Sequence, residues 1–415
     1  MISRRELMAT TTAVCVAGAL GTEAAPGAEA GLRPLTTRAQ PITPQERKAR
    51  IDKIQGLMQQ QKIGAFLVEA GSTLEYFTGV RWRTSERTTA AVIPAAGRVV
   101  IVTPFFEEPS IRESLAVDGE VRHWQEDESP FDLLAAVYRE RGAARGPLAV
   151  DPNTRFFVFD KVAGAVGSAQ STVPGEGLVR VCRMRKSPAE LALMQVANDV
   201  TIAAIRHVHA HVQAGMRNSD IEDLLIATTE ALGGVHLFSL VLLNEASAFP
   251  HGSVKPQHVR AGSVILIDTG CDVHGYQSDI SRSWVFGEPS ARQRELWNTV
   301  KRGQEVALET AKIGIPVGTI DKAVRDFYES KGWSKDYGLP GLSHRTGHGI
   351  GMDGHEPPYL VRSDTTPLEA GMCFSDEPGL YVPGEFGIRL EDCWHMTDAG
   401  PKLFTPLATS IDQPV

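Results

Sequence analysis

The stretch SVILIDTG at residues 263–270 indicates the fold more strongly than any other part of the chain. It is an apolar, largely β-branched run that ends in a carboxylate and a turn, as is typical of a buried strand. The chain then turns back through Gly275, and YQSDISRSW at 276–284 predicts the second strand of a hairpin. This hairpin predicts a buried sheet that delivers Asp268 to a polar site.

The second strand of this hairpin is expected to have a polar face. Successive side chains of a strand point to opposite faces, so Asp279, Ser281 and Ser283 should share one face, while Ile280 and Trp284 share the other. Two acids across a hairpin can be ordinary surface residues. A carboxylate that closes so apolar a run favours a shared site instead.

Three later motifs carry polar groups of the same kind. In SHRTGHGIG, glycines on both sides of His348 let the backbone approach a ligand closely and expose the imidazole. Glu377 follows another apolar run, MCFSD. In GIRLED, Arg389 and Glu391 are expected on the same side of a strand.

These motifs together predict a centre for two divalent metal ions. The expected ligands are four carboxylates and one neutral imidazole: Asp268, Asp279, His348, Glu377 and Glu391. Such an oxygen-rich set without thiolates suits manganese best, and cobalt or zinc are also possible. Two ions about 3.5 to 4 Å apart can share carboxylates and a bridging water, whose pKa then falls enough to supply hydroxide near neutral pH. The chemistry expected of this set is hydrolysis.

The organisation of the chain predicts two domains after an N-terminal leader. TPQE at 43–46 has a capping-box pattern with proline at the first helical position, which predicts a helix to about Gln61. Short apolar runs then alternate with helix-like segments, a rhythm typical of α/β structure. The predicted segments are a leader at 1–30, a linker at 31–42, a smaller α/β domain at 43–182 and a catalytic domain at 183–411.

The first thirty residues read as an export signal. Arg4 and Arg5 precede an uncharged stretch from Met8 to Leu20, and Ala28-Glu29-Ala30 supplies small residues for cleavage. The pattern is similar to a twin-arginine leader, so a periplasmic or secreted protein is expected. An N-terminus that is not exported is the alternative.

The composition excludes some partners. A formal charge of -8 argues against a nucleic-acid or anionic-membrane surface, because phosphate binding needs a concentrated positive field. The five cysteines show no pair with two-residue spacing, and we interpret them as small buried apolar residues.

From about Lys186 to Phe404 the chain resembles the pita-bread metallopeptidases, the group of prolidase, aminopeptidase P and methionine aminopeptidase, with creatinase as a metal-free relative. The preceding segment resembles the creatinase/prolidase N-terminal domain. All five ligand positions hold the expected residue types in the expected order. The resemblance implies an α/β fold with a C-terminal pita-bread domain behind a smaller creatinase-like domain. It also implies a homodimer.

The resemblance adds roles for further residues. It implies that Glu377 also handles protons, that His251 and His355 contact the substrate and stabilise the tetrahedral intermediate, and that Arg389 orients the metal-binding acids. Arg362, seven positions beyond His355, is a candidate for binding the free carboxylate of a dipeptide. Asp376 departs from the family pattern, in which many relatives carry a small hydroxyl or aliphatic residue at this position.

The function implied is cleavage of the peptide bond before proline by a metal-bridging hydroxide. A prolidase, or Xaa-Pro dipeptidase, is favoured slightly over an aminopeptidase P that removes the first residue of longer peptides. Another reaction on the same metals, such as a lyase or esterase, stays open because function is grafted onto a fold. A metal-free binding module is disfavoured because the chain keeps all five ligand positions.

Overall fold

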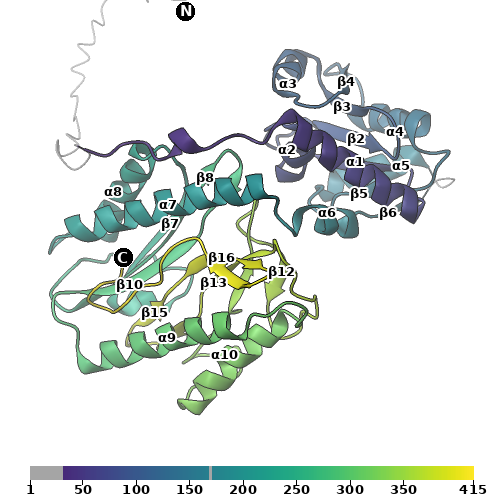
Figure 1. The fold of residues 1–415 in the computed structure, drawn as a ribbon. Coiled ribbons are helices and arrows are strands. Elements are labelled where there is room, and N and C mark those ends of the chain that lie inside the picture. Colours follow the sequence, from purple (N-terminus) through teal and green to yellow (C-terminus); the bar gives the residue numbers. More distant parts are fainter. Residues whose placement is uncertain (1–30, 168–170) are drawn as a thin grey trace, which may run out of the picture. The chain divides into compact units, whose positions relative to one another are not determined.

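The computed structural model describes residues 31–167 and 171–415, shown as the coloured ribbon in Figure 1. The predicted leader at 1–30 lies outside the described residues, and so does Cys15 within it. A short 3-10 helix, η1 (Thr36–Arg38), precedes the first long helix. In that helix the side chain of Thr43 accepts a hydrogen bond from the backbone N–H of Glu46 at 3.2 Å, so the predicted cap is confirmed.

The segment from 44 to 183 forms one mixed sheet with helices on it. Its strand order is β4-β3-β2-β1-β5-β6, with β2 antiparallel to both of its neighbours and the remaining pairs parallel. The strands are β1 (Ala65–Glu69), β2 (Ala90–Pro94), β3 (Val99–Pro104), β4 (Gly119–Trp124), β5 (Leu148–Val150) and β6 (Thr172–Pro174). The helices are α1 (Pro44–Gln61), α2 (Ser72–Thr78), η2 (Phe105–Glu107), α3 (Glu108–Ser114), α4 (Pro130–Arg141), α5 (Phe156–Val166) and α6 (Glu176–Arg183).

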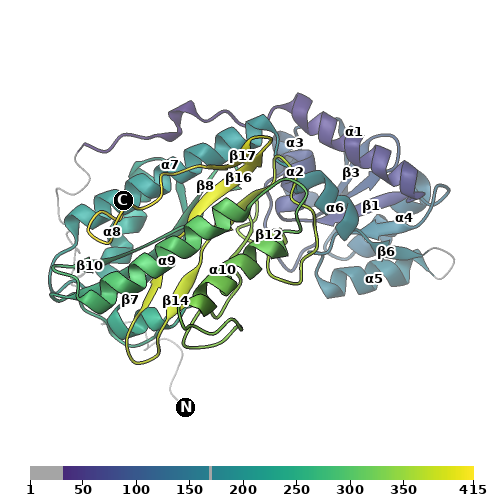
Figure 2. The ribbon, with the colours of Figure 1, turned by 60° about the horizontal axis from the view of Figure 1, so that its bottom comes forward.

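The C-terminal half has strands between two pairs of helices. Helices α7 and α8 lie on one side of the strands and α9 and α10 on the other, as Figures 1 and 2 show. The helices are α7 (Pro188–His211), α8 (Asn218–Ala231), η3 (Asn244–Ala248), α9 (Ala291–Thr310) and α10 (Gly318–Ser330). The mixed α/β architecture predicted from the sequence is therefore confirmed.

The strands of this half form two larger sheets and one short pair. The first sheet has the order β10-β8-β7, with β9 paired to β8, and the second has the order β12-β11-β13-β16-β17. The first set is β7 (Val235–Leu243), β8 (Ser263–Val273), β9 (Tyr276–Gln277) and β10 (Ile280–Phe286). The others are β11 (Gly347–Gly349), β12 (Glu356–Leu360), β13 (Cys373–Asp376), β14 (Gly379–Tyr381), β15 (Gly387–Arg389), β16 (Asp392–Thr397) and β17 (Gly400–Leu403).

The central hairpin differs from its prediction in one respect. Strand β8 does not end after Asp268 but continues to Val273, because its second half pairs with β7 and β9. Asp279 lies in the break between β9 and β10 and not within a strand. A Cβ atom on Gly270 would lie 2.1 Å from the carbonyl oxygen of Ser278, so glycine is required where the chain crosses at this break.

A buried ionic network joins the segment before α7 to the C-terminal half. Arg183 contacts Glu356 at 2.8 Å and donates to the Ser72 hydroxyl at 3.0 Å. Lys186 also pairs with Glu356, and both cationic side chains are almost fully buried. Because Glu356 directly follows His355, this network fixes the backbone of a candidate site residue.

One sequence-based expectation, the state of the cysteines, can be checked away from the site. Cys182, Cys271, Cys373 and Cys393 are buried free thiols, as expected. Across residues 31–167 and 171–415, no helix has both the length and the apolar character needed to cross a membrane.

Candidate metal centre

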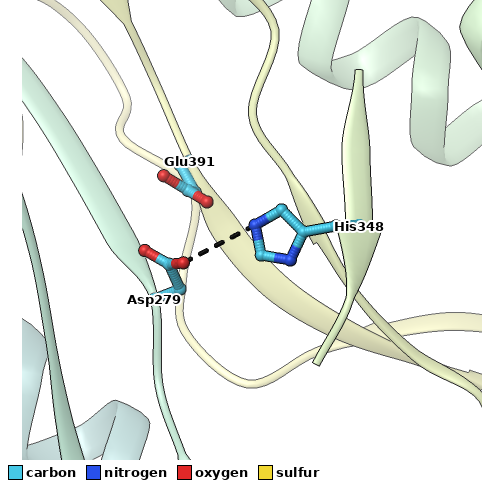
Figure 3. A group of neighbouring side chains, drawn as sticks. All are labelled: Asp279, His348 and Glu391. Carbon is cyan, nitrogen blue, oxygen red and sulfur yellow. Dashed lines mark ion pairs between the residues drawn. The ribbon is translucent and has the colours of Figure 1, made fainter. Parts of the chain in front are cut away.

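Three of the predicted ligands converge on one point. Asp279, His348 and Glu391 each offer one ligand atom, and these atoms all lie within 4.8 Å of one another. Figure 3 shows the three side chains pointing toward each other from separate segments, with His348 Nε2 3.6 Å from Asp279 Oδ2. All three are buried, with residue exposures of 5%, 1% and 1%.

The other two predicted ligands lie beside this group. Glu377 Oε1 is 3.3 Å from His348 Nε2, and Asp268 forms an ion pair with Arg389. Burial, followed by the negative charges of Glu391, Asp268 and Glu377, raises the pKa of Asp279 well above its usual value. Burial and neighbouring carboxylates also raise the pKa of Glu391. Repulsion of this kind is expected where carboxylates surround a point meant for cations.

The residues present fit divalent cations. Within the described part of the chain, Asp268 Oδ1 and Glu391 Oε1 are buried without a hydrogen-bond partner, which is costly unless a ligand satisfies them. His348 Nδ1 lies 3.1 Å from the carbonyl oxygen of Gly349, which can only accept, so Nδ1 carries the proton. Burial lowers the pKa of His348 well below its usual value, so the ring is neutral. Its Nε2 lone pair is then free to bind a metal ion.

A layer of hydroxyl groups holds this centre in place. Ser283 Oγ donates to the carbonyl oxygen of Arg389 at 2.9 Å and accepts from its N–H at 3.1 Å. Ser281 contacts both Arg389 and Glu391 through its hydroxyl. The predicted shared face of Ser281 with Ser283 is confirmed. The expected strand through Arg389 and Glu391 is wrong, because β15 ends at Arg389 and Glu391 lies in the break before β16, although Arg389 Nε is 3.9 Å from Glu391 Oε2. Arg389 lies against Asp268 and Glu391, where the resemblance implied.

Asp376 points away from the centre. Its neighbours in sequence face the site, because Ser375 Oγ accepts from the N–H of His348 at 3.0 Å and lies 3.4 Å from Glu377 Oε1. Asp376 lies across from Asp392 in the sheet, where Gln304 of α9 donates to the backbone carbonyl oxygen of Asp376 at 3.4 Å and to Asp392 Oδ2 at 3.0 Å. Among the described residues, neither carboxylate oxygen of Asp376 has a hydrogen-bond partner. This extra acid is therefore not placed as a sixth ligand.

The remaining predicted site residues lie at different distances from this group. The ring of His355 lies 4.0 Å from the ring of His348. His251 is exposed at the rim, directly after Pro250, whose carbonyl oxygen accepts from Arg389 at 3.3 Å. Arg362 is not brought to this group. It is exposed, its guanidinium lies over the ring of Tyr337, and it pairs with Asp336 at 3.3 Å.

Two residues at the centre have no role in the sequence-based prediction. His344 Nε2 lies 2.8 Å from the Tyr381 hydroxyl, and His344 Nδ1 lies 3.8 Å from Glu377 Oε2. Burial, followed by the charge of Arg389, lowers the pKa of His344 to about 3, so this ring is neutral. The only signal in the sequence is its place four residues before His348. Tyr381 is 37 residues further on, and no local pattern connects the two.

This geometry is that of a metal-dependent hydrolase: several buried carboxylates with unsatisfied oxygens surround one neutral imidazole. The comparisons with known proteins agree. Residues 192–398 match metallopeptidase family M24, and residues 50–185 match the creatinase/prolidase N-terminal domain. The chain belongs to metallopeptidase family M24, and it is a peptidase.

Relatives and solved structures cover most of the chain. It is 31% identical to the probable dipeptidase PepE of Mycobacterium tuberculosis, over 81% of this chain and 88% of the relative. It is 29% identical to the Xaa-Pro dipeptidase of Lactobacillus helveticus, over 86% and 96%. The crystal structure of dipeptidase PepE from Mycobacterium ulcerans matches with a TM-score of 0.80 at 28% identity, over 88% of this chain and 97% of the other. A prolidase structure from Thermococcus sibiricus matches with a TM-score of 0.79 at 27% identity, over 86% and 96%.

Proposed function

We propose that this protein is an Xaa-Pro dipeptidase whose two divalent metal ions are bound by Asp268, Asp279, His348, Glu377 and Glu391. The observation that carries the proposal is the convergence of these side chains, two of them with unsatisfied buried oxygens, in a chain that covers nearly the whole length of an Xaa-Pro dipeptidase. Two cations bound there would polarise a carbonyl as Lewis acids and lower the pKa of water. Manganese suits the ligand set best.

Glu377 is proposed to move the proton of the reaction. In the metal-free protein, burial raises the pKa of Glu377 to about 7. A carboxylate beside the attacking water can accept a proton and release it again during the reaction. It can take the proton from the attacking water and return it to the departing proline nitrogen. The Ser375 hydroxyl, 3.4 Å from Glu377 Oε1, helps to fix this carboxylate.

Histidines are proposed to stabilise the negative charge of the tetrahedral intermediate. The ring of His355 lies 4.0 Å from that of His348, so its ring N–H is close enough to the centre to donate to the developing oxyanion. His251 at the rim is the second candidate donor. His344, held by Tyr381, is a third group in reach of Glu377.

A peptide bond to proline has no N–H, so a pocket for it must accept the ring and need not satisfy a donor.

We propose further that the N-terminal segment directs export to the periplasm or beyond the cell, and that the enzyme is a homodimer. These two proposals rest on the twin-arginine pattern and on the family resemblance. Fractionation of cells that express the full chain and light scattering of the purified protein test them.

The decisive experiment measures hydrolysis by protein stripped of metal and reloaded with manganese. The substrates are Ala-Pro, Gly-Pro, Ala-Pro-Ala and a longer Xaa-Pro peptide, with Asp279→Ala protein as the control. We expect turnover of the two dipeptides alone, and only by reloaded wild-type protein. Turnover of the longer peptides would move the assignment to an Xaa-Pro aminopeptidase. If the protein binds two metal ions and cleaves none of these peptides, another substrate class would be required.

A further inference from the structure

A second group of buried oxygen atoms lies behind the predicted metal ligands, where helix α9 meets strands β13 and β16. Two acids of this group, Asp376 and Asp392, are cross-strand partners, and both are fully buried. Asp376 directly precedes Glu377 in the chain. Asp392 directly follows Glu391. A group that binds these acids therefore acts on the backbone that carries two predicted ligands.

The two acids differ in how well their charges are compensated. Asp392 Oδ1 pairs with Arg282 at 2.6 Å and accepts from the Thr405 hydroxyl at 2.6 Å. Asp392 Oδ2 accepts from Gln304 Nε2 at 3.0 Å. Within residues 31–167 and 171–415, by contrast, neither carboxylate oxygen of Asp376 has a hydrogen-bond partner. An ionised carboxylate in the core is strongly unfavourable unless a cation or hydrogen bonds compensate it.

The charges around Asp376 are mostly negative. Burial, followed by the negative charges of Asp392 and Glu377, raises the pKa of Asp376 well above its usual value. Lys301 of α9 acts on it in the opposite direction, but the Lys301 ammonium already pairs with Glu305 at 3.1 Å. Burial together with repulsion between acids also marks the predicted ligands of the metal centre. A cation beside Asp376 would offset this repulsion.

Two neutral oxygen atoms complete the group. In the described part of the chain, Gln304 Oε1 and the Tyr328 hydroxyl are likewise buried without a hydrogen-bond partner. Gln304 Nε2 donates to the carbonyl oxygen of Asp376 at 3.4 Å, so the amide group lies beside this acid. Tyr328 of α10 reaches the same turn of α9, because a Cβ atom on Gly303 would lie 2.4 Å from its hydroxyl oxygen. Burial, followed by the negative charge of Asp376, raises the pKa of Tyr328, so the phenol is neutral and near the acid.

The chemistry of these groups selects the kind of ligand. They offer oxygen atoms from one carboxylate, one amide and one phenol, and such oxygen ligands suit hard cations. Arg282 offsets the charge of Asp392, so the group carries one net negative charge. A divalent ion would leave a net positive charge in the core, whereas a monovalent ion leaves none.

We propose that Asp376, Gln304 and Tyr328 bind a monovalent alkali-metal cation, sodium or potassium, behind the metal centre. The bound cation holds α9 against β13 and β16 and so steadies the backbone of Glu377 and Glu391. This site goes beyond the proposed function and does not depend on which peptide is cleaved.

The test follows thermal unfolding of manganese-loaded protein in sodium, potassium or choline chloride at one constant ionic strength. Elemental analysis first confirms that protein dialysed against choline chloride contains neither alkali ion. For wild-type protein we expect sodium or potassium to raise Tm by about 2 to 5 °C over choline at about 100 times the dissociation constant.

The main variant is Asp376→Val, an aliphatic residue of the type that many relatives are expected to carry there. In choline chloride it should unfold at a higher temperature than wild-type protein, because it removes a buried carboxylate without a partner. It should respond to neither ion.

Tyr328→Phe provides a second variant that removes one proposed ligand atom and keeps the ring. It should raise the ion concentration needed for half of the Tm increase by about 10-fold. The matched control is Tyr138→Phe, which removes a buried hydroxyl that donates to the carbonyl oxygen of Gly146 at 2.8 Å. This control should keep the full response to the ion.

The outcomes decide the inference separately from the proposed function. A response to sodium alone or to potassium alone identifies the ion and supports the site. Equal Tm values of wild-type protein in all three salts would overturn the inference, because Asp376 is then a neutral acid in the core. A full response that persists in both Asp376→Val and Tyr328→Phe would also overturn it, because the ion then binds elsewhere. Peptide hydrolysis is not a readout here, so each of these outcomes leaves the proposed function unchanged.

Discussion

The Ser281 hydroxyl donates a hydrogen bond to Glu391 Oε2 at 2.7 Å. Ser281 Oγ also accepts a hydrogen bond from Arg389 Nε at 2.9 Å, and Ser281 is the cross-strand partner of Asp268. One small, fully buried side chain therefore orients a predicted ligand and the arginine that pairs with another. Groups that orient metal ligands in this way commonly contribute as much to affinity as the ligands' own geometry.

We predict that Ser281→Ala lowers manganese affinity by about 10- to 100-fold while the protein stays folded. The change removes one hydroxyl and leaves Glu391 and Arg389 to interact directly. Isothermal titration of metal-free protein measures the affinity, and thermal unfolding at saturating manganese measures the fold. The matched control is Thr299→Ala on α9, which removes a partly exposed hydroxyl that bonds within its own helix. An affinity equal to that of the control would show that the Ser281 hydroxyl does not orient Glu391 for metal binding.

We predict that Asp279→Ala abolishes hydrolysis and reduces bound metal to less than one ion per chain. Asp279 belongs to the converging group, and burial followed by repulsion from neighbouring acids raises its pKa, so its removal relieves strain in the metal-free protein. Elemental analysis of the purified variant gives the metal content. Asp52→Asn, an exposed acid paired with Lys48, should keep both metal and activity. Full metal occupancy in the Asp279 variant would exclude it as a ligand.

The sequence predicts the side-chain directions that depend only on alternation along a single strand. Ser281 and Ser283 face Arg389 as expected, since period-two alternation is a local property. The break that places Asp279 could not be predicted, because it depends on the close crossing of Ser278 over Gly270 from the neighbouring strand. The same holds for His344, whose partner Tyr381 comes from a different strand.

Arg362 illustrates the opposite error, in which nearness in sequence suggests nearness in space. After β12 the chain turns tightly, with the N–H of Asp364 bonded to the carbonyl oxygen of Val361. This turn carries Arg362 toward Asp336 and Tyr337 and away from His355.

We predict that the metal-free protein loses stability as pH rises from about 4.5 to 7. Burial raises the pKa of Glu377 to about 7 and raises those of Asp279 and Glu391 as well. The folded state therefore holds more protons than the unfolded state in this window, and stability falls as they are released. Glu377 alone contributes on the order of 3 kcal/mol. Saturating manganese should remove the trend, because cations compensate the ionised carboxylates.

Thermal unfolding of chelator-treated protein between pH 4.5 and 8, with and without manganese, measures this dependence. Glu377→Gln should flatten the metal-free curve, since the amide has no proton to release. A metal-free protein whose stability rises through this window would mean that these carboxylates have ordinary pKa values in the folded state.

We predict that Arg282→Met destabilises the protein by about 3 to 5 kcal/mol, although Arg282 touches no substrate. Arg282 and Asp392 are both fully buried and lie 2.6 Å apart, and Arg282 also donates to the carbonyl oxygen of Glu391 at 2.7 Å. Removing the cation leaves Asp392 charged in the core with hydrogen bonds from Thr405 and Gln304. Urea unfolding of the manganese-loaded protein measures the loss.

The double variant Arg282→Met/Asp392→Leu should recover a large part of this lost stability, because no unpaired charge is left behind. The exposed pair Lys322 and Asp326 on α10 provides the control, and Lys322→Met should change stability far less. A double variant as unstable as the single one would show that Arg282 acts mainly through the Glu391 backbone and not through Asp392.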